Sequence, residues 1–163
     1  MVFTQNYIDL QKLRMNDRLD VRVHIREDLL DVTVPKCCVQ LLVENAILHG
    51  ITGDRSSIHI RIEATETIHE DNPDGASCFN LTVSDDGAGI PADRLQEIRR
   101  SLKAPLSQTN AGSIGLVNLS SRLKLMAPEA SFLQIESVEG TGTRVSLVMN
   151  LQRSRTNVQS IDH

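Results

Sequence analysis

The chain has 163 residues, a formal net charge of −4, 40% hydrophobic residues and only 2% aromatic residues. These values predict one globular domain with an aliphatic core. The acidic balance and the scarcity of aromatic rings argue against a nucleic-acid partner, because such partners are bound by basic surfaces and by base stacking. No apolar run approaches a membrane span and no signal peptide is present, so we expect a soluble chain.

Hydrophobic periodicity predicts helices and strands in an irregular order. They are a helix over 3–15, a strand over 20–26, a helix over about 36–49, strands around 58–63 and 79–83, a helix from Pro91, a helix over 114–126, and strands around 133–135 and 145–151. Residues 64–77 are polar and read as a connection. Residues 103–113 have no periodicity and several turn formers, so we expect a mobile loop of the lid type.

This order predicts an α+β fold in which helices pack on one face of a mixed sheet. It is not a βαβαβ series, so the glycines after Val83 do not form a dinucleotide fingerprint, and no phosphate loop of the Gly-x-x-x-x-Gly-Lys type occurs. The three cysteines, Cys37, Cys38 and Cys78, lack metal-ligand spacing. We expect all three to be reduced core or near-core residues of a cytosolic domain.

The helix over 36–49 carries the first candidate site. Pro35 lies near its start and Gly50 is its expected stop. Its apolar residues lie on both sides and no Lys or Arg occurs between Lys36 and Arg55, so we expect it to be mostly buried. A buried Glu44–Asn45 pair is unfavourable unless it is satisfied. Either these groups cap neighbouring loops, or they face a ligand or metal.

Four short motifs then follow one another along the chain. They are Glu44-Asn45 with His49-Gly50, Asp85-x-Gly87-x-Gly89, Gly112-Ser113-Ile114-Gly115-Leu116 with Asn118 and Arg122, and Gly140-Thr141-Gly142-Thr143. Each motif alone is a weak signal. Together they resemble the ATP-binding domain of sensor histidine kinases of the LytS/YesM type, within the Bergerat-fold (GHKL) ATPases that include gyrase, Hsp90 and MutL. The resemblance covers roughly residues 20–150, and residues 7–14 look like the segment that precedes this domain.

The resemblance implies a two-layer α/β sandwich, the Bergerat fold, with a mixed sheet of about five strands, helices on one face and a mobile ATP lid. It implies that ATP and Mg²⁺ bind. Asp85 would accept a hydrogen bond from the exocyclic amine of adenine, while Gly87 and Gly89 would let the backbone approach the base. Asn45 would be the Mg²⁺ ligand, and Glu44 would be the general base that helps the attacking histidine.

The same resemblance assigns the phosphate end. Gly112 and Gly115 would place backbone amides against the phosphates at a helix start. His49 would orient Asn45 or touch phosphate, and Gly140 and Gly142 would shape the rim. Arg122 would either hold Asn118 and the lid base or be a solvated helix residue. The implied ATP-binding set is Asn45, His49, Asp85, Gly87, Gly89, Ile90, Gly112, Ser113, Ile114, Gly115, Leu116 and Thr143.

Two positions depart from the family pattern. Ser113 stands where many members have Gly, and Leu48 stands where many have Lys or Arg, so a cationic phosphate contact is missing. The phosphoacceptor histidine of these kinases lies upstream in a helical dimerisation segment, and none of the five histidines here has that context. The chain therefore resembles a catalytic part that cannot complete autophosphorylation alone.

The implied division is residues 1–19 as the end of a helical dimerisation or linker segment, 20–151 as the catalytic domain and 152–163 as a polar tail. The implied function is transfer of the γ-phosphoryl group of ATP to a histidine outside this chain, for relay to a response regulator. The full protein would be a homodimeric, membrane-bound bacterial sensor kinase with this domain in the cytoplasm. Two alternatives stay open: an anti-sigma-type Ser kinase or regulator, and a non-catalytic nucleotide-binding interaction module.

Overall fold

The computed structural model describes residues 2–51, 57–68, 77–103, 114–127 and 131–151. The helices are α1 (Val2–Met15), α2 (Cys38–Gly50), α3 (Ala92–Lys103) and α4 (Ile114–Met126). The strands are β1 (Leu19–Ile25), β2 (Ile58–Ile68), β3 (Ser77–Asp85), β4 (Phe132–Val138) and β5 (Gly142–Asn150). Each predicted helix and strand is confirmed. β2 is longer than predicted, because its last residues continue the ladder with β3 into the stretch that reads as a polar connection.

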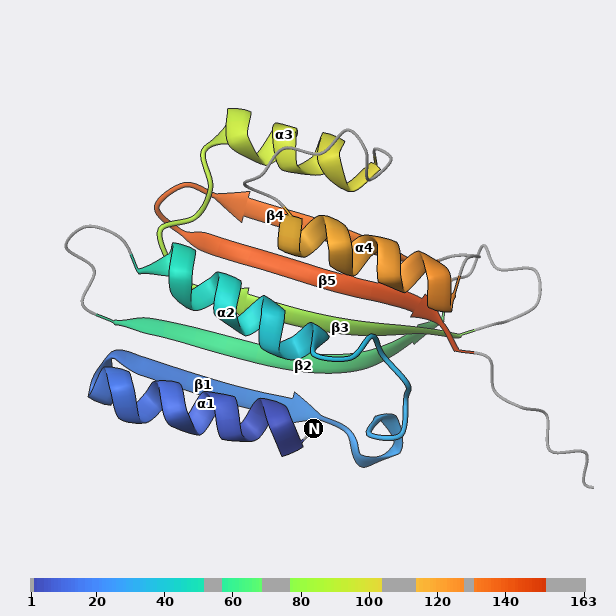
Figure 1. Cartoon of the computed structure of the whole chain (residues 1–163), viewed down its shortest axis with the longest axis horizontal. Helices are drawn as coiled ribbons and strands as arrows, with labels where there is room; N and C mark the ends of the chain where they lie inside the picture. The colour runs from blue at the N-terminus through green and yellow to red at the C-terminus, as the bar shows by residue number, and fades with distance from the viewer. Residues whose placement is uncertain (1, 52–56, 69–76, 104–113, 128–130, 152–163) are drawn as a thin grey trace, which may run out of the picture.

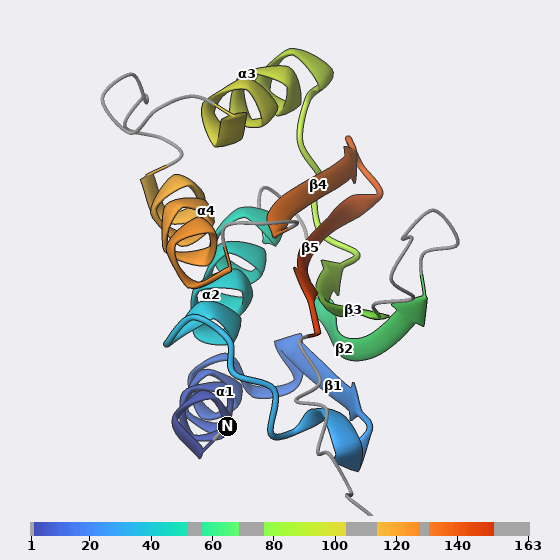
Figure 2. The same cartoon turned by 90° about the vertical axis from the view of Figure 1, so that its right-hand side faces the viewer.

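The strands form one five-stranded sheet in the order β1-β2-β3-β5-β4 (Figure 1). β1 and β2 run parallel and the other pairs run antiparallel, so the sheet is mixed, as predicted. Figure 2 shows α1, α2 and α4 side by side on one face of the sheet. α3 packs against β4 and α4. This is the predicted two-layer α+β sandwich.

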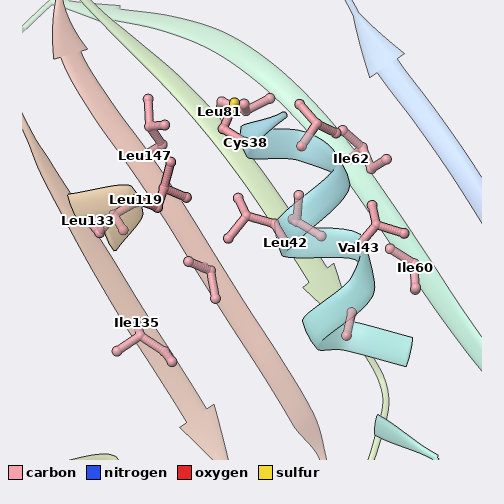
Figure 3. Packing of buried hydrophobic residues seen from close by; sticks show 14 of the residues in the cluster. Cys38, Leu42, Val43, Ile60, Ile62, Leu81, Leu119, Leu133, Ile135 and Leu147 are labelled. Atoms are coloured by element: carbon pink, nitrogen blue, oxygen red, sulfur yellow. The ribbon is translucent and has the colours of Figure 1, made fainter. Parts of the chain in front are cut away.

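The core lies between this helical layer and the inner face of the sheet. Alternate residues of each strand point inward, because successive side chains of a strand lie on opposite faces. Figure 3 shows Leu42 and Val43 of α2 among Ile60, Ile62 and Leu147 of the sheet. The core is aliphatic, as the composition predicts, and Phe79 is the single aromatic side chain among its described buried members.

α1 belongs to this core. Its Ile8 is only 2% exposed, and the helix packs against β1 and α2. No helix in the described ranges combines the length and the apolar character needed to cross a lipid bilayer.

Three expectations about single residues are wrong. Val23 is 41% exposed although the alternation of the strand turns it inward, and it lies in β1, which is an edge strand of the sheet. Cys37 is exposed and adopts a left-handed backbone (φ 61°) just before α2, so it is not a core residue. Leu48 is 70% exposed, so α2 is less buried on its second side than its composition indicates. Cys37, Cys38 and Cys78 are all free thiols.

Candidate functional site

A cavity opens between the helical layer and the strands at the carboxyl end of α2. Its walls are mainly apolar, and its polar side chains are Asn45, His49, Asp85 and Thr143, a composition typical of small-molecule sites. The lining residues are Leu42, Asn45, Ala46, His49, Gly50, Val83, Asp85, Ile90, Ile98, Gly115, Leu116, Ile135, Thr143 and Val145.

The cavity brings together residues from all four sequence motifs. The predicted site residues that line it are Asn45, His49, Asp85, Ile90, Gly115, Leu116 and Thr143. Glu44, Gly87, Gly89 and Ile114 are described but do not line it. The expected lid over 103–113 lies outside the described residues except for its first residue. The same holds for Gly112 and Ser113. The apolar wall, including Val83, Ile98 and Ile135, reads in the sequence only as core.

Asp85 ends β3 and is held by the loop that follows it. Its Oδ1 accepts a hydrogen bond from the backbone N–H of Gly87 at 2.8 Å. Gly87 in turn lies against α2, because a Cβ there would be 2.3 Å from the Cα of Gly50. The N–H of Ala88 donates to the carbonyl of Gly50 at 2.9 Å. Backbone contacts therefore fix the aspartate relative to α2.

This packing also revises the role of Gly50. The residue is the last of α2 and not the stop after it. A Cβ at Gly50 would lie 2.2 Å from Cδ1 of Ile58. Gly50 thus leaves room for the Ile58 side chain of β2 against the end of α2.

The turn between β4 and β5 closes onto the same loop. Gly89 (φ 67°) leaves no room for a side chain, since a Cβ would lie 2.0 Å from the carbonyl oxygen of Val138. Gly142 (φ 137°) is equally tight, since a Cβ would lie 2.0 Å from the carbonyl oxygen of Asp85. Gly140 donates its N–H to the carbonyl of Ala88 at 2.7 Å. These glycines let two backbone segments touch beside the cavity.

Ser137 on β4 is a functional candidate that the sequence motifs miss. Its hydroxyl accepts a hydrogen bond from the N–H of Ile90 at 2.9 Å and donates to the carbonyl of Gly142 at 2.8 Å. It also lies 2.9 Å from Oγ1 of Thr143. The sequence does contain one indication. Ser137 lies on the same face of β4 as the buried residues Leu133 and Ile135, and a polar residue on that face needs hydrogen-bond partners.

The polar residues of α2 point in different directions. Asn45 lines the cavity, and its Nδ2 is buried with no hydrogen-bond partner among the described residues. His49 lines the cavity while its side chain stays exposed. Glu44 accepts a hydrogen bond from Nε2 of Gln40 at 2.9 Å. Burial, and next the Glu44 carboxylate, raise the pKa of Tyr7 on α1.

The neighbouring carboxylate, Asp86, has a different environment. Its Oδ1 accepts from the backbone N–H of His59 at 2.8 Å, and its Oδ2 lies 2.7 Å from the ring Nδ1 of His59. Burial raises the pKa of Asp86, but these hydrogen bonds and the charge of His59 outweigh burial and lower it below its ordinary value. Asp86 therefore serves the β2–β3 ladder, while Asp85 serves the cavity.

Gly115 of α4 lies beside Leu41 of α2. A Cβ at Gly115 would lie 3.3 Å from Cδ1 of Leu41, so the glycine leaves room for this side chain. Arg122 donates to the carbonyl of Lys36, just before α2. Arg122 is an exposed helix residue, as one of the two alternatives predicts, and its bond to Lys36 also ties α4 to the segment that enters α2. The lid base lies outside the described residues, so the other alternative stays a prediction.

Comparison with known proteins adds to this geometry. Residues 30–153 match the family model of histidine kinase-, DNA gyrase B- and HSP90-like ATPases. The chain is similar to the sensor protein LytS of Staphylococcus epidermidis, with 31% identity over 149 residues that cover 91% of this chain and 23% of that protein. It is also similar to the sensor protein kinase HptS of Staphylococcus aureus, with 27% identity over 157 residues, 96% of this chain and 28% of that protein.

Solved structures show the same fold. The histidine kinase domain of a blue-light-activated histidine kinase from Erythrobacter litoralis aligns with a TM-score of 0.55 and 22% identity, over 92% of this chain and 60% of that chain. The catalytic domain of histidine kinase ThkA aligns with a TM-score of 0.57 and 13% identity, over 90% and 92%. The chain spans about a quarter of the length of LytS and HptS.

Proposed function

The chain belongs to the family of histidine kinase-, DNA gyrase B- and HSP90-like ATPases, and on this premise we propose that it is the ATP-binding catalytic domain of a two-component sensor histidine kinase. The similarity to the sensor proteins LytS and HptS supports this assignment. In this proposal the chain is the cytoplasmic part of a membrane-bound bacterial sensor, and residues 1–19 end the helical segment through which the full protein dimerises.

The placement of Asp85 is the observation that carries the proposal. A carboxylate held by the N–H of Gly87 stands at the end of a mainly apolar cavity. Adenine has flat apolar faces and an exocyclic amine that donates hydrogen bonds. The apolar wall, with Val83, Ile98 and Ile135, would cover the base, and Asp85 would accept a hydrogen bond from the amine. We assign Gly87, Gly89 and Ile90 to the loop that shapes this end.

Asn45 is the residue that we propose for Mg²⁺. Asn45 lines the cavity, and its Nδ2 is buried without a hydrogen-bond partner among the described residues. Nδ2 is a donor, so an acceptor such as a phosphate oxygen would satisfy it, and the amide oxygen would stay available for the cation. Among the described residues, no cluster of three or more His, Cys, Asp or Glu side chains could hold a metal. One amide oxygen suits Mg²⁺, which takes most of its ligands from nucleotide phosphates and water. When bound, Mg²⁺ would neutralise phosphate charge.

Phosphoryl transfer would then depend on position and charge. The bond from the γ-phosphorus to the bridging oxygen of ATP breaks, a bond to a histidine nitrogen outside this chain forms, and ADP leaves. We propose that Glu44 takes the proton of that histidine. His49 and the segment Gly112, Ser113, Ile114, Gly115 and Leu116 would contact the phosphates. A response regulator would receive the group afterwards.

Calorimetric titration of this chain with ATP, ADP and GTP, each with and without Mg²⁺, tests the binding part of the proposal. We expect micromolar binding of ATP and ADP that is specific for adenine and stronger for ATP with Mg²⁺. The absence of adenine-nucleotide binding would contradict the proposal.

One observation favours a second candidate, a nucleotide-binding interaction module without catalysis. Glu44 does not line the cavity and is hydrogen-bonded by Gln40. Glu44→Gln distinguishes the two candidates in a longer chain that contains the phosphoacceptor helix. A catalytic base predicts unchanged ATP affinity and a loss of phosphoryl transfer by about 100-fold or more. Transfer at the wild-type rate would remove Glu44 as the base, and no transfer by either protein would favour the interaction module.

A further inference from the structure

Ser137, Thr143 and Asp85 form a row across three neighbouring strands at the end of the cavity. Thr143 of β5 is the register partner of Asp85 on β3 and of Ser137 on β4. Asp85 and Thr143 line the cavity, and the Ser137 hydroxyl lies 2.9 Å from Oγ1 of Thr143 on the side away from Asp85.

The partners of Ser137 decide which hydroxyl donates to which. A backbone N–H can only donate and a backbone carbonyl can only accept. Ser137 therefore receives the proton of the Ile90 N–H and gives its own single proton to the carbonyl of Gly142. No proton remains for Thr143, so Thr143 must donate to Ser137 across the 2.9 Å contact.

This arrangement determines which hydrogen-bonding role the Thr143 hydroxyl can take toward a ligand. With its proton turned to Ser137, the Thr143 hydroxyl presents only lone pairs to a ligand. The carboxylate of Asp85, whose Oδ1 accepts the N–H of Gly87, is also an acceptor. Both polar side chains of this strand pair therefore favour a ligand group that donates hydrogen bonds.

We propose that Ser137 is a specificity-determining positioning residue, which holds the Thr143 hydroxyl as an acceptor so that the cavity selects a 6-amino purine over a 6-keto purine. The inference rests on the proposed function and deepens it. The amino group of adenine supplies donors, directly or through a water molecule. The keto oxygen of hypoxanthine would face acceptors only, and an unpaired polar group at a buried site lowers affinity strongly.

Removal of the Ser137 hydroxyl releases the Thr143 proton. The Thr143 hydroxyl can then rotate and donate to a keto oxygen. In Ser137→Ala we therefore expect the ratio of the dissociation constants of inosine triphosphate and ATP to fall by about tenfold, the factor that corresponds to one ordinary hydrogen bond. A purely structural role would weaken both nucleotides equally and leave the ratio unchanged.

Calorimetric titration of the whole chain with ATP and inosine triphosphate, both with Mg²⁺, measures this ratio. Ser137→Thr keeps a hydroxyl at the same position and should keep the wild-type ratio. Ser146→Ala is the matched control. Ser146 lies 3.1 Å from Oγ1 of its cross-strand partner Thr82, so it makes the same kind of pair, but on the outer face of the sheet.

The outcomes separate this inference from the proposed function. Wild-type protein that binds no ATP would overturn both. Wild-type protein that binds ATP while Ser137→Ala keeps the wild-type ratio, or that binds both nucleotides equally, would overturn only the role of Ser137. If Ser137→Ala does not fold, Thr143→Val, of similar shape and without a hydroxyl, provides the test: a folded variant with an unchanged ratio would overturn the inference.

Discussion

The two walls of the cavity are built in different ways. On the strand wall, the backbone N–H of Gly87 holds Asp85 and the Ser137 hydroxyl holds Thr143. The Asp85 loop touches both α2 and the β4–β5 turn through backbone atoms. On the helix wall, Nδ2 of Asn45 is buried without a hydrogen-bond partner among the described residues, and His49 is exposed. In our proposal, the firmly held strand wall binds the rigid, uncharged base of the nucleotide. The helix wall would bind the charged and hydrated phosphates.

The largest effect should come from a side chain between the backbone segments of the strand wall. Gly142→Ala combines a φ of 137° with a Cβ placed 2.0 Å from the carbonyl oxygen of Asp85. We expect the free energy of unfolding to fall by about 3 kcal/mol or more, since strain and overpacking add. Gly140→Ala is the control, because Gly140 has a φ of 78° but no atom within 4 Å of its Cβ position. The control should lose about 1 kcal/mol. Urea unfolding measures both variants. If Gly142→Ala and Gly140→Ala lost the same free energy of unfolding, the close backbone contact at Gly142 would not be the cause of the larger expected loss.

The next effect concerns recognition by the strand wall. Asp85→Asn should weaken the binding of both ATP and adenosine by about tenfold or more, because a hydrogen bond to a charged group contributes about 1.5–3 kcal/mol. Asp86→Asn is the matched control, since that carboxylate binds His59. Calorimetry on both variants checks the assignment. Unchanged ATP affinity in Asp85→Asn would reject the adenine contact.

A smaller effect should separate the helix wall from the strand wall. We expect His49→Ala to weaken ATP binding by about threefold, less than one net hydrogen bond, because the side chain is exposed. Adenosine affinity should not change, because adenosine has no phosphates. Titrations with the two ligands give the answer, and an equal loss for both would place His49 beside the base.

The smallest effect is the pH dependence of the Asp86–His59 contact. The lowered pKa of Asp86 in the folded state means that its contribution to stability is present above the unfolded pKa near 3.8 and is lost as pH falls through the folded value. Both side chains are more than half exposed, so the contribution should stay under about 1 kcal/mol. Urea unfolding of wild type and Asp86→Asn between pH 6 and pH 2 (roughly the range that spans carboxyl titration) should show the steeper decline in wild type. Parallel curves would contradict it.

The sequence predicts the elements well because each has a clear period. The alternation of Ile58, Ile60 and Ile62 and the helical spacing in α4 depend on local burial, and the structure confirms both. The fold also brings four residues that the motifs single out into one cavity, namely Asn45, His49, Asp85 and Thr143.

What the sequence cannot provide is the pairing of distant segments. The row of Asp85, Thr143 and Ser137 depends on strand register, which no local pattern encodes. The direction of Glu44 was ambiguous because α2 is apolar on both sides, so periodicity does not say which side faces α1. The sequence predicts Gly50 as a helix stop and Gly87 as a point of approach for the base, whereas the structure shows that their backbones also lie against each other.

That glycine pair has a consequence for how the chain can change over generations. Most packing errors are repaired by a second substitution nearby, in which a smaller neighbour makes room for a larger one. Gly50 and Gly87 have no side chain to give up, and each already faces the Cα of the other. At Gly50 the first obstacle to a side chain is Cδ1 of Ile58, so a shorter residue at position 58 could make room. At Gly87 the obstacle is the backbone of Gly50, and no exchange of a neighbouring side chain could remove it. Substitutions over generations must therefore leave Gly87 in place, or they must change the path of the backbone that carries Asp85.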